Sequence, residues 1–508
     1  MAEGVNTVAS GFASHAEGDF PVASGFASHA EGSITTASGD ISHAEGTGTT
    51  ASGLESHAEG NNTTASGLVS HAEGANTKAN GEISHAEGYG TTANGGASHA
   101  EGSGTKAEGD SAHAEGSNTI ASGISSHAEG GVGFDSSPAP TLASGISSHA
   151  EGIDTKASGL ASHAEGNTTE ARGEVSHAEG SHTFAVGFAA HAEGESTFAS
   201  GETSHAEGGS TVASGGASHA EGGGTEASGD VSHAEGRFTT ASGDASHTEG
   251  AFTTASGDVS HAEGFRTTAS GIVSHAEGRF TNTAGFEGAH IMGQFGNATE
   301  EFSWFIANGT SSAPGLGAKW VSTSGNMAIE GAFVHGTADY AEMFESLDGN
   351  LIDVGYFVTI EGDKIRKATS QDTYIVGVTS ATPGVIGDSR ELRWKNKFVT
   401  DEWGRIQHHE VVIPAETDKE GRVILPERKE IQPILNPDWD PEREYFSRLK
   451  RPEWVAVGLV GKLLIRDDGS CEVNGYCMPN DEGIATATTN GYRVMKRTGP
   501  NQIMILLR

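Results

Sequence analysis

The sequence is poor in cysteine and in aromatic residues, and it contains no long apolar run. Its 508 residues include two cysteines, Cys471 and Cys477, and 6 % aromatics. Two cysteines cannot build a disulfide framework, and no zinc-ligand pattern surrounds them. No window approaches 18 apolar residues, and the N-terminus MAEGVNTVASG has neither a basic nor an apolar segment. We therefore expect no membrane insertion and no signal peptide.

Basic residues are scarce over the first part of the chain. Residues 1–290 contain 37 Asp and Glu against 7 Lys and Arg, whereas the remaining 218 residues contain 31 against 23. All six Trp lie in that second part. Because nucleic acids and anionic membranes both require Lys and Arg, so acidic a first part argues against either as a partner. The chain reads as two different polymers joined end to end.

The first part is a 14-residue repeat centred on a histidine in the motif S/A-H-A-E-G. The second half of each repeat reads T-x-A-S-G, as in residues 49–53 and 63–67. The spacing is broken by a step of 22 between His127 and His149, where GFDSSPAP is inserted at 133–140, and by a step of 15 into a degenerate last copy at His290. So regular a period indicates a repeat architecture.

A period of 14 with about two Gly per repeat excludes collagen, which needs Gly at every third residue, and a helix, which so much Gly would break. A solenoid with two very short strands per coil remains. Alternation within S-H-A-E places Ser and Ala on one face and His and Glu on the other. Small Ser and Ala side chains suit a thin core. Twenty coils would stack into a rod on the order of 95 Å long, with the insert looping out of one coil.

One such coil buries little apolar surface, so we expect several chains to pack together, as a homotrimer. The region resembles the YadA-like head repeats of trimeric adhesins, which implies a left-handed parallel β-roll over about 1–290. The export machinery of those adhesins is not visible, which argues against a secreted autotransporter.

The His and Glu ladders admit two interpretations. Recurring imidazole and carboxylate groups could bind metal ions, but regular stacking rewards identical residues in register whether or not a ligand exists. We predict a structural role, with no metal and no cofactor. A Thr ladder (Thr36, Thr50, Thr64, Thr92) is typical of ice-binding solenoids, but Lys and Glu interrupt it, so the rod is predicted to be a spacer or binding surface.

After a connector at 291–336 with short strands, residues 337–508 contain apolar and β-branched runs separated by turn residues. These include YFVTI, YIVGVTS, HHEVVIP, WVAVGLVGKLLI, YRVMKR and QIMILLR. They predict a compact, mostly β domain, with one possible helix near 440–450, where DPEREYFSRLK has an acidic start and a basic end.

Three carboxylates at spacings of three stand in HGTADYAEMFE: Asp339, Glu342 and Glu345. On a helical turn they would share one face and raise one another's pKa, as an acid and base pair requires. Taken alone, this pattern is also typical of the acidic first turn of a structural helix.

Several motifs in order resemble the autoproteolytic intramolecular chaperone domain of phage pre-neck appendage proteins, a glutamic-type self-cleaving peptidase. They are GTADYAEMFE, IVGVTSATPGVIGD, NPDWDPEREY, RPEWVAVGLVGKLLIRDDG and GYRVMKR, over about 337–508. The resemblance implies a trimeric chaperone that assembles the upstream rod and then cuts itself off. It implies a scissile bond between Ala338 and Asp339, with Asp339 and Glu342 as the catalytic acids.

Residue chemistry narrows the mechanism. An N→O or N→S acyl shift needs Ser, Thr or Cys directly after the scissile bond, and Asp339 stands there. The Asp339 carboxyl could act on its own peptide bond, or Glu342 could activate a water. No hydroxyl stands directly before the cut, because residue 338 is Ala.

The sequence therefore predicts a phage or prophage appendage subunit, of tail-spike or fibre type, that is made in the bacterial cytoplasm and carried on the virion. The alternative is an adhesive surface rod, at the cell surface or extracellular, whose C-terminal domain is a permanent trimerisation cap. A polysaccharide-degrading spike lacks candidate cleft residues. The rod could bind a host-cell receptor or polysaccharide in either case.

Overall fold

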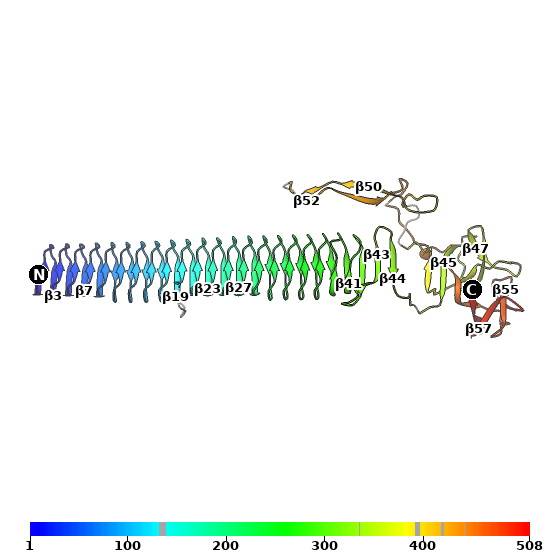
Figure 1. Ribbon diagram of the computed structural model, residues 1–508, viewed down its shortest axis with the longest axis horizontal. Coiled ribbons are helices and arrows are strands. Elements are labelled where there is room, and N and C mark those ends of the chain that lie inside the picture. The colour runs from blue at the N-terminus through cyan, green and yellow to red at the C-terminus, as the bar shows by residue number, and fades with distance from the viewer. Residues whose placement is uncertain (132–138, 335, 392–396, 418–420, 441) are drawn as a thin grey trace. The chain divides into compact units, whose positions relative to one another are not determined.

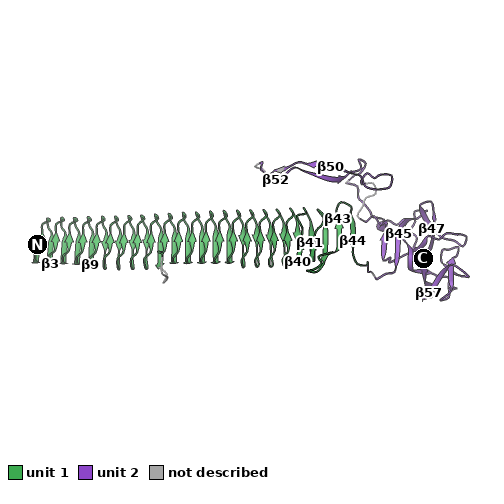
Figure 2. Ribbon diagram, viewed as in Figure 1, with its two compact units in different colours: residues 1–332 green, residues 333–508 purple. Residues whose placement is uncertain are grey.

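The chain forms two compact units, which are treated separately: Met1–Ala332 and Phe333–Arg508 (Figure 2). The computed structural model describes residues 1–131, 139–334, 336–391, 397–417, 421–440 and 442–508. Both units are built from β-strands (Figure 1), so the expected mostly β fold is confirmed.

The first unit is a parallel β-solenoid whose coils follow the 14-residue repeat. Odd-numbered strands from β3 (His15–Asp19) to β39 (His275–Ala276) each begin at a repeat histidine, and two-residue even-numbered strands run from β2 (Val8–Ala9) to β38 (Thr268–Ala269). Each strand pairs in parallel with its counterpart one coil away, as in His43↔His57 and Thr50↔Thr64. Stacked histidine rings are 4.8 Å apart in most steps, the spacing of neighbouring strands.

Small side chains fill the core of the solenoid. The two repeat alanines, such as Ala44 and Ala51, are fully buried, and so is the first Thr of T-x-A, such as Thr49. The repeat serine is buried and donates to the carbonyl oxygen three residues earlier, as Ser56 does to Gly53 at 2.8 Å. The predicted alternation of buried Ser and Ala with outward His and Glu is confirmed. The buried Thr was not foreseen.

The coil stack is uninterrupted at the insert, because His127 pairs directly with His149. Residues 132–138, most of the predicted loop at 133–140, lie outside the described residues. Past the last regular coil, parallel pairing continues through β40 (Arg279–Asn282), β41 (His290–Asn297) and β42 (Trp304–Asn308). The antiparallel strands β43 (Leu316–Val321) and β44 (Asn326–Ile329) complete this sheet.

The second unit centres on a ten-stranded, mostly antiparallel sheet. Its long central strand is β54 (Trp454–Arg466), which pairs with β45 (Asp339–Glu345), β48 (Gly377–Thr379) and β58 (Gln502–Leu507). The other members are β46 (Phe357–Glu361), β47 (Lys364–Lys367), β49 (Val385–Gly387), β55 (Tyr476–Pro479), β56 (Ala485–Thr488) and β57 (Tyr492–Gly499). Apolar side chains such as Phe357, Ile465 and Ile505 form its core.

Two small ladders complete this unit: β50 (His408–Ile413) with β53 (Arg428–Pro433), and β51 (Glu416–Thr417) with β52 (Val423–Leu425). The helix considered near 440–450 is wrong over the described residues there, which hold one 3₁₀ turn, η1 (Arg448–Lys450). Tertiary contacts override the local pattern: the Arg448 guanidinium lies over the Trp454 ring at 3.7 Å, and the Arg448 amide donates to Ser389. No helix in the described ranges has the length and apolarity of a membrane span.

Candidate functional site

The segment with three carboxylates is a strand, so the prediction of a shared helical face is wrong. Strand β45 pairs with β54 on one side and with β49 on the other, and these ladder hydrogen bonds outweigh the local helical spacing. In a strand, side chains alternate between faces. Asp339, Ala341 and Met343 are buried, whereas Tyr340 and Glu342 are more exposed. Asp339 and Glu342 therefore point to opposite faces of β45.

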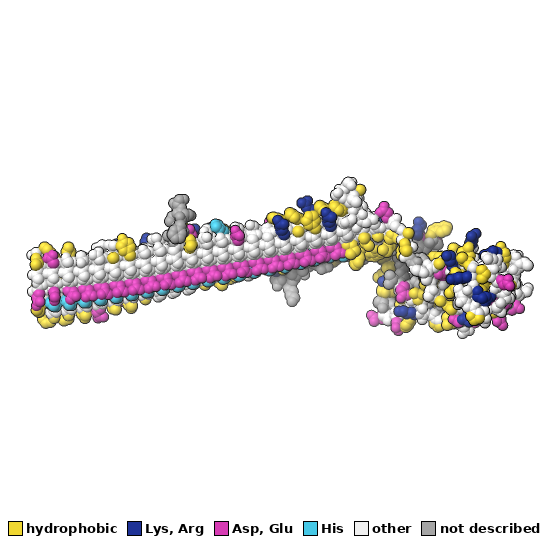
Figure 3. Space-filling model, turned by 90° about the horizontal axis from the view of Figure 1, so that it is seen from below, with side chains coloured by type: hydrophobic (Ala, Val, Ile, Leu, Met, Phe, Trp, Pro, Cys, Tyr) yellow, Lys and Arg dark blue, Asp and Glu magenta, His cyan; other side chains and the backbone are white. Residues whose placement is uncertain are grey.

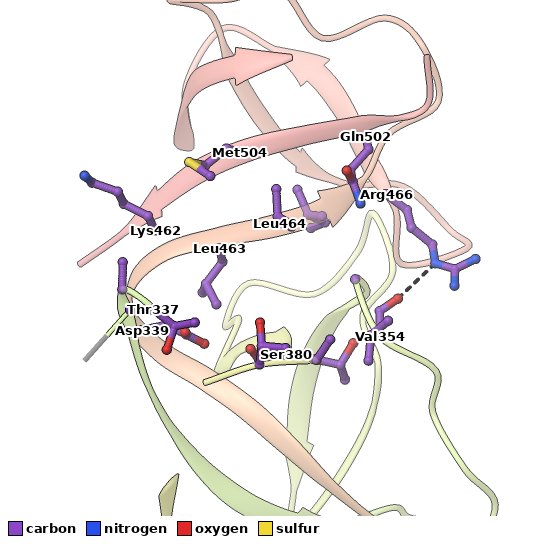
Figure 4. Close-up of a pocket in the computed structure, with 17 residues that line it drawn as sticks. Thr337, Asp339, Val354, Ser380, Lys462, Leu463, Leu464, Arg466, Gln502 and Met504 are labelled. Atoms are coloured by element: carbon purple, nitrogen blue, oxygen red, sulfur yellow. Dashed lines mark hydrogen bonds between the residues drawn. The ribbon is translucent and has the colours of Figure 1, made fainter. Parts of the chain in front are cut away.

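Asp339 lies at the start of β45 beside a cavity of about 410 Å³. Thr337, Ala338, Ser380, Lys462 and Leu463 are among the other residues that line this cavity (Figure 4). The Asp339 side chain is only 6 % exposed, and its Oδ2 atom has no hydrogen-bond partner among the described groups. A buried carboxylate oxygen without a partner is costly, and such costs are typical of functional sites.

The peptide bond between Ala338 and Asp339 is held on both sides by backbone. The Gly384 amide donates to the Asp339 carbonyl oxygen at 2.9 Å, and the Lys462 amide donates to the Ala338 carbonyl oxygen at 3.4 Å. Gly461 has φ +124°, and a Cβ there would stand 2.2 Å from the Ala338 oxygen. Only glycine allows β54 to approach this bond so closely.

Glu342 does not line the cavity. It accepts a hydrogen bond from the Tyr340 hydroxyl at 2.7 Å, which raises the pKa of Tyr340. A Cβ on Gly387 would lie 3.0 Å from the Glu342 side chain, so glycine in β49 leaves room for this pair. Glu345 instead forms an ion pair with Lys364 at 2.7 Å. Of the two predicted acids, the structure brings Asp339 alone against the predicted bond within one chain.

Sequence reasoning missed the groups of β54 that contact this bond, Gly461 and Lys462, and also Gly384. A signal was present, because two glycines interrupt the apolar run WVAVGLVGKLLI, and glycine inside a strand often marks a close backbone approach. Both cysteines are free and buried, and burial raises the pKa of Cys477 to about 12 and that of Cys471 further. Neither thiol is suited to act as a nucleophile.

A second titratable array is the ladder of His and Glu along the solenoid, the cyan and magenta stripes of Figure 3. The histidine Nε2 atoms lie 3.1–4.0 Å from Glu carboxylate oxygens of their own or the preceding coil, as in His205 with Glu193 at 3.1 Å. Sets such as His29, Glu31 and His43 place one ligand atom each within 4.8 Å of the others. The structural role that we expect for the ladder stays a prediction.

The carboxylates of this ladder alternate in acidity from coil to coil. Hydrogen bonding to a neighbouring Glu raises the pKa of every second carboxyl to about 7 and lowers the pKa of those between. The raised set is Glu45, Glu73, Glu101, Glu151 and Glu179; the lowered set is Glu59, Glu87, Glu115, Glu165 and Glu193. Protonated and ionised carboxyls therefore alternate near pH 6.

Glu73→Gln is expected to leave thermal stability unchanged at pH 6 and to raise it at pH 8. The folded pKa of Glu73 is about 7, above its ordinary value, so the stability that Glu73 contributes is fully present only below about pH 4.5. That contribution is lost as the pH rises through 7, and glutamine imitates the protonated form at every pH. Differential scanning calorimetry at both pH values measures the change.

Glu87→Gln is the matched control. The pKa of Glu87 is lowered, chiefly by hydrogen bonding to Glu101 and then to Glu73, so its stabilising contribution is present above the ordinary carboxyl pKa. Removing this anion is expected to lower stability at pH 6, where Glu73→Gln is neutral. Indistinguishable pH profiles for the two variants would contradict the alternation.

Comparison with known proteins identifies the second part of the chain. Residues 270–502 match the family model described as Peptidase_G2, IMC autoproteolytic cleavage domain. The pre-neck appendage proteins of Bacillus phages B103 and phi29 are each 34 % identical over 175 residues, 33 % of this chain and 19 % of theirs. The putative phage-related protein YobO of Bacillus subtilis is 36 % identical over 185 residues, 35 % of this chain and 22 % of its own.

Two solved structures are also similar. The C-terminal fragment of bacteriophage phi29 gene product 12 is 33 % identical, with 34 % of this chain and all of that chain covered and a TM-score of 0.28. The pre-mature form of the same gene product is 18 % identical, with all of this chain and 58 % of that chain covered and a TM-score of 0.40. The chain spans about a fifth of the length of the curated relatives it matches. The resemblance to pre-neck appendage proteins and their autoproteolytic domain is confirmed.

Proposed function

We propose that this chain is a structural subunit of a phage or prophage appendage and that its C-terminal domain drives trimer assembly and then cuts the chain between Ala338 and Asp339. The observation that carries the proposal is the buried, unpartnered Asp339 carboxylate at the start of β45, beside that bond and within the matched autoproteolytic domain. Assembly takes place in the host cytoplasm, and the trimeric rod then becomes part of the virion.

Cleavage is a single hydrolysis. The Asp339 carboxylate lies at the cavity, where it can take a proton from a water that attacks the Ala338 carbonyl carbon. The Lys462 amide already contacts the Ala338 oxygen, so it stabilises the negative charge that develops there. The C–N bond breaks, Ala338 leaves as a new carboxylate, and Asp339 leaves as a new α-amine. Glu342 acts from the opposite face of the strand, as a positioning residue for β45 with Tyr340.

The rod needs a separate assembly domain because its repeats do not define register. Each coil pairs with a coil of nearly the same sequence, so a slip of 14 residues preserves almost every contact. A non-repetitive trimer at one end fixes the alignment of three chains and nucleates the stack. Later cleavage removes the domain that set the equilibrium, so assembly becomes kinetically irreversible.

The alternative function is an adhesive surface rod with a permanent trimerisation cap. Denaturing electrophoresis and intact mass of freshly produced chain separate the two functions. The proposal expects fragments 1–338 and 339–508, with fragment 1–338 a homogeneous trimer by light scattering. A chain that ends at residue 338 from the start should form mixed or misregistered assemblies. Recovery of the same homogeneous trimer from the truncated chain would contradict the chaperone role, and one uncut band would leave a permanent cap.

A further inference from the structure

Five coils at the C-terminal end of the rod carry a row of Arg and Phe that the other coils lack. The two residues after the glycine of H-A-E-G, or its equivalent, are Arg237 and Phe238, Ala251 and Phe252, Phe265 and Arg266, Arg279 and Phe280, and Gln294 and Phe295 in successive coils. We name these residues the Arg/Phe row. Dark-blue and yellow side chains gather on this stretch of the rod in Figure 3. Three of the seven basic residues of 1–290 stand here.

The backbone of the row is strained for the residues it holds. The second position of each pair lies in the left-handed region, with φ 53° at Phe238, 58° at Phe252 and 50° at Phe295. Described coils from Gly48 to Gly224 carry Gly, Asn, Asp, Thr, His or Ser there, although Phe20 and Ile34 occur near the N-terminus. A bulky side chain is unfavourable in this conformation. Strain retained over five successive coils points to a function for the side chains.

The three arginines of the row are not neutralised by the rod. Their guanidinium groups lie over phenylalanine rings at 5.0–5.8 Å: Arg237 over Phe238, Arg266 over Phe252, Phe265 and Phe280, and Arg279 over Phe280 and Phe295. Among the described residues, no carboxylate lies within ion-pair distance of them. In so acidic a rod, three stacked but unpaired arginines form a local anion-binding surface.

The phenylalanines provide apolar platforms beside these charges. Phe238 is 48 % exposed, Phe252 40 % and Phe265 39 %. At the C-terminal end of the row, Arg279, Phe280 and Phe295 open onto a cavity of about 440 Å³ that Asn297 and Ser311 also line. Guanidinium groups, aromatic faces and a terminal polar cavity thus follow one another at the coil spacing of about 4.8 Å.

We propose that the Arg/Phe row binds an acidic polysaccharide, a linear glycan whose sugars carry carboxylates. The apolar faces of the sugar rings stack on the phenylalanines, and the carboxylates pair with Arg237, Arg266 and Arg279. A sugar residue in an extended glycan advances by about the spacing of one coil, so a repeating polymer fits a repeating row. Nucleic acid is disfavoured by the acidic rod around the row. This inference does not depend on self-cleavage.

Titration of the full-length protein with an oligogalacturonate of about ten sugars, followed by calorimetry, tests the row. Binding is expected with wild type and to weaken at least tenfold in R237Q/R266Q/R279Q and in F238N/F252N. Asn occupies the same backbone position in other coils, as at Asn62 and Asn76, so the second variant relieves strain and should fold. K78Q/K106Q, which removes two basic residues outside the row, should bind like wild type.

The comparison ligands are a neutral dextran oligomer of equal length and a single-stranded oligothymidylate. Neither should bind with comparable affinity. The proposal is overturned if oligogalacturonate does not bind wild type, if the row variants bind it unchanged, or if oligothymidylate binds more tightly. Thermal melting of each variant shows whether a loss of binding reflects unfolding.

Discussion

Replacing Asp339 by alanine is expected to turn a self-cutting chain into one that stays intact at 52.0 kDa. The carboxylate lies beside the predicted bond with one oxygen unpartnered, and no other carboxylate is among the described residues that line the cavity. Loss of an acid–base group costs about 10²- to 10⁴-fold in rate. Intact mass measured over several days of incubation would record the uncut chain.

Two other carboxylates of the same strand serve as comparisons. Glu342→Gln removes the acceptor of the Tyr340 hydroxyl and is expected to slow cleavage, whereas Glu345→Gln loses an exposed ion pair with Lys364 and should cut like wild type. Asp339→Asn keeps the volume of the side chain and should be as inactive as the alanine variant. Complete cleavage in both Asp339 variants would remove this residue from the mechanism.

Substituting Gly67 by alanine is expected to destabilise the solenoid locally by on the order of 3 kcal/mol. A Cβ at this position would lie 1.8 Å from the carbonyl oxygen of Gly81 in the next coil, and backbone cannot move aside without opening the coil spacing. Because stability in repeat proteins is a sum of neighbouring interfaces, the loss should be confined to a few coils. Native-state hydrogen exchange resolved by peptide would locate it.

Gly223→Ala is the control, since no atom lies within 4 Å of the added Cβ and Ala75 already occupies the same repeat position. Its exchange should match that of wild type in every coil. Equal protection in both variants would show that coil spacing tolerates a side chain at Gly67, against the packing described above.

The repeat could be predicted because one periodicity determines every coil. The spacing of His, Ala and Gly specifies strand starts, core and turns together, and no distant segment alters them. The site was only partly predictable. Asp339 and the bond before it follow from the motif, but the strand at 339–345 depends on pairing with β54, more than a hundred residues away. The amides of Lys462 and Gly384 carry no side-chain signature at all.

The in-register pairing across the insert has a consequence for how such rods change over generations. His127 pairs with His149 as any histidine pairs with the next, although 22 residues separate them instead of 14. Whole coils can therefore be duplicated or deleted, and loops inserted, without altering the contacts of the coils that remain. Length becomes a quantity that recombination can adjust in steps of one strand spacing, about 4.8 Å. An appendage built on this scheme can be lengthened or shortened to suit a new host envelope while its assembly domain stays the same.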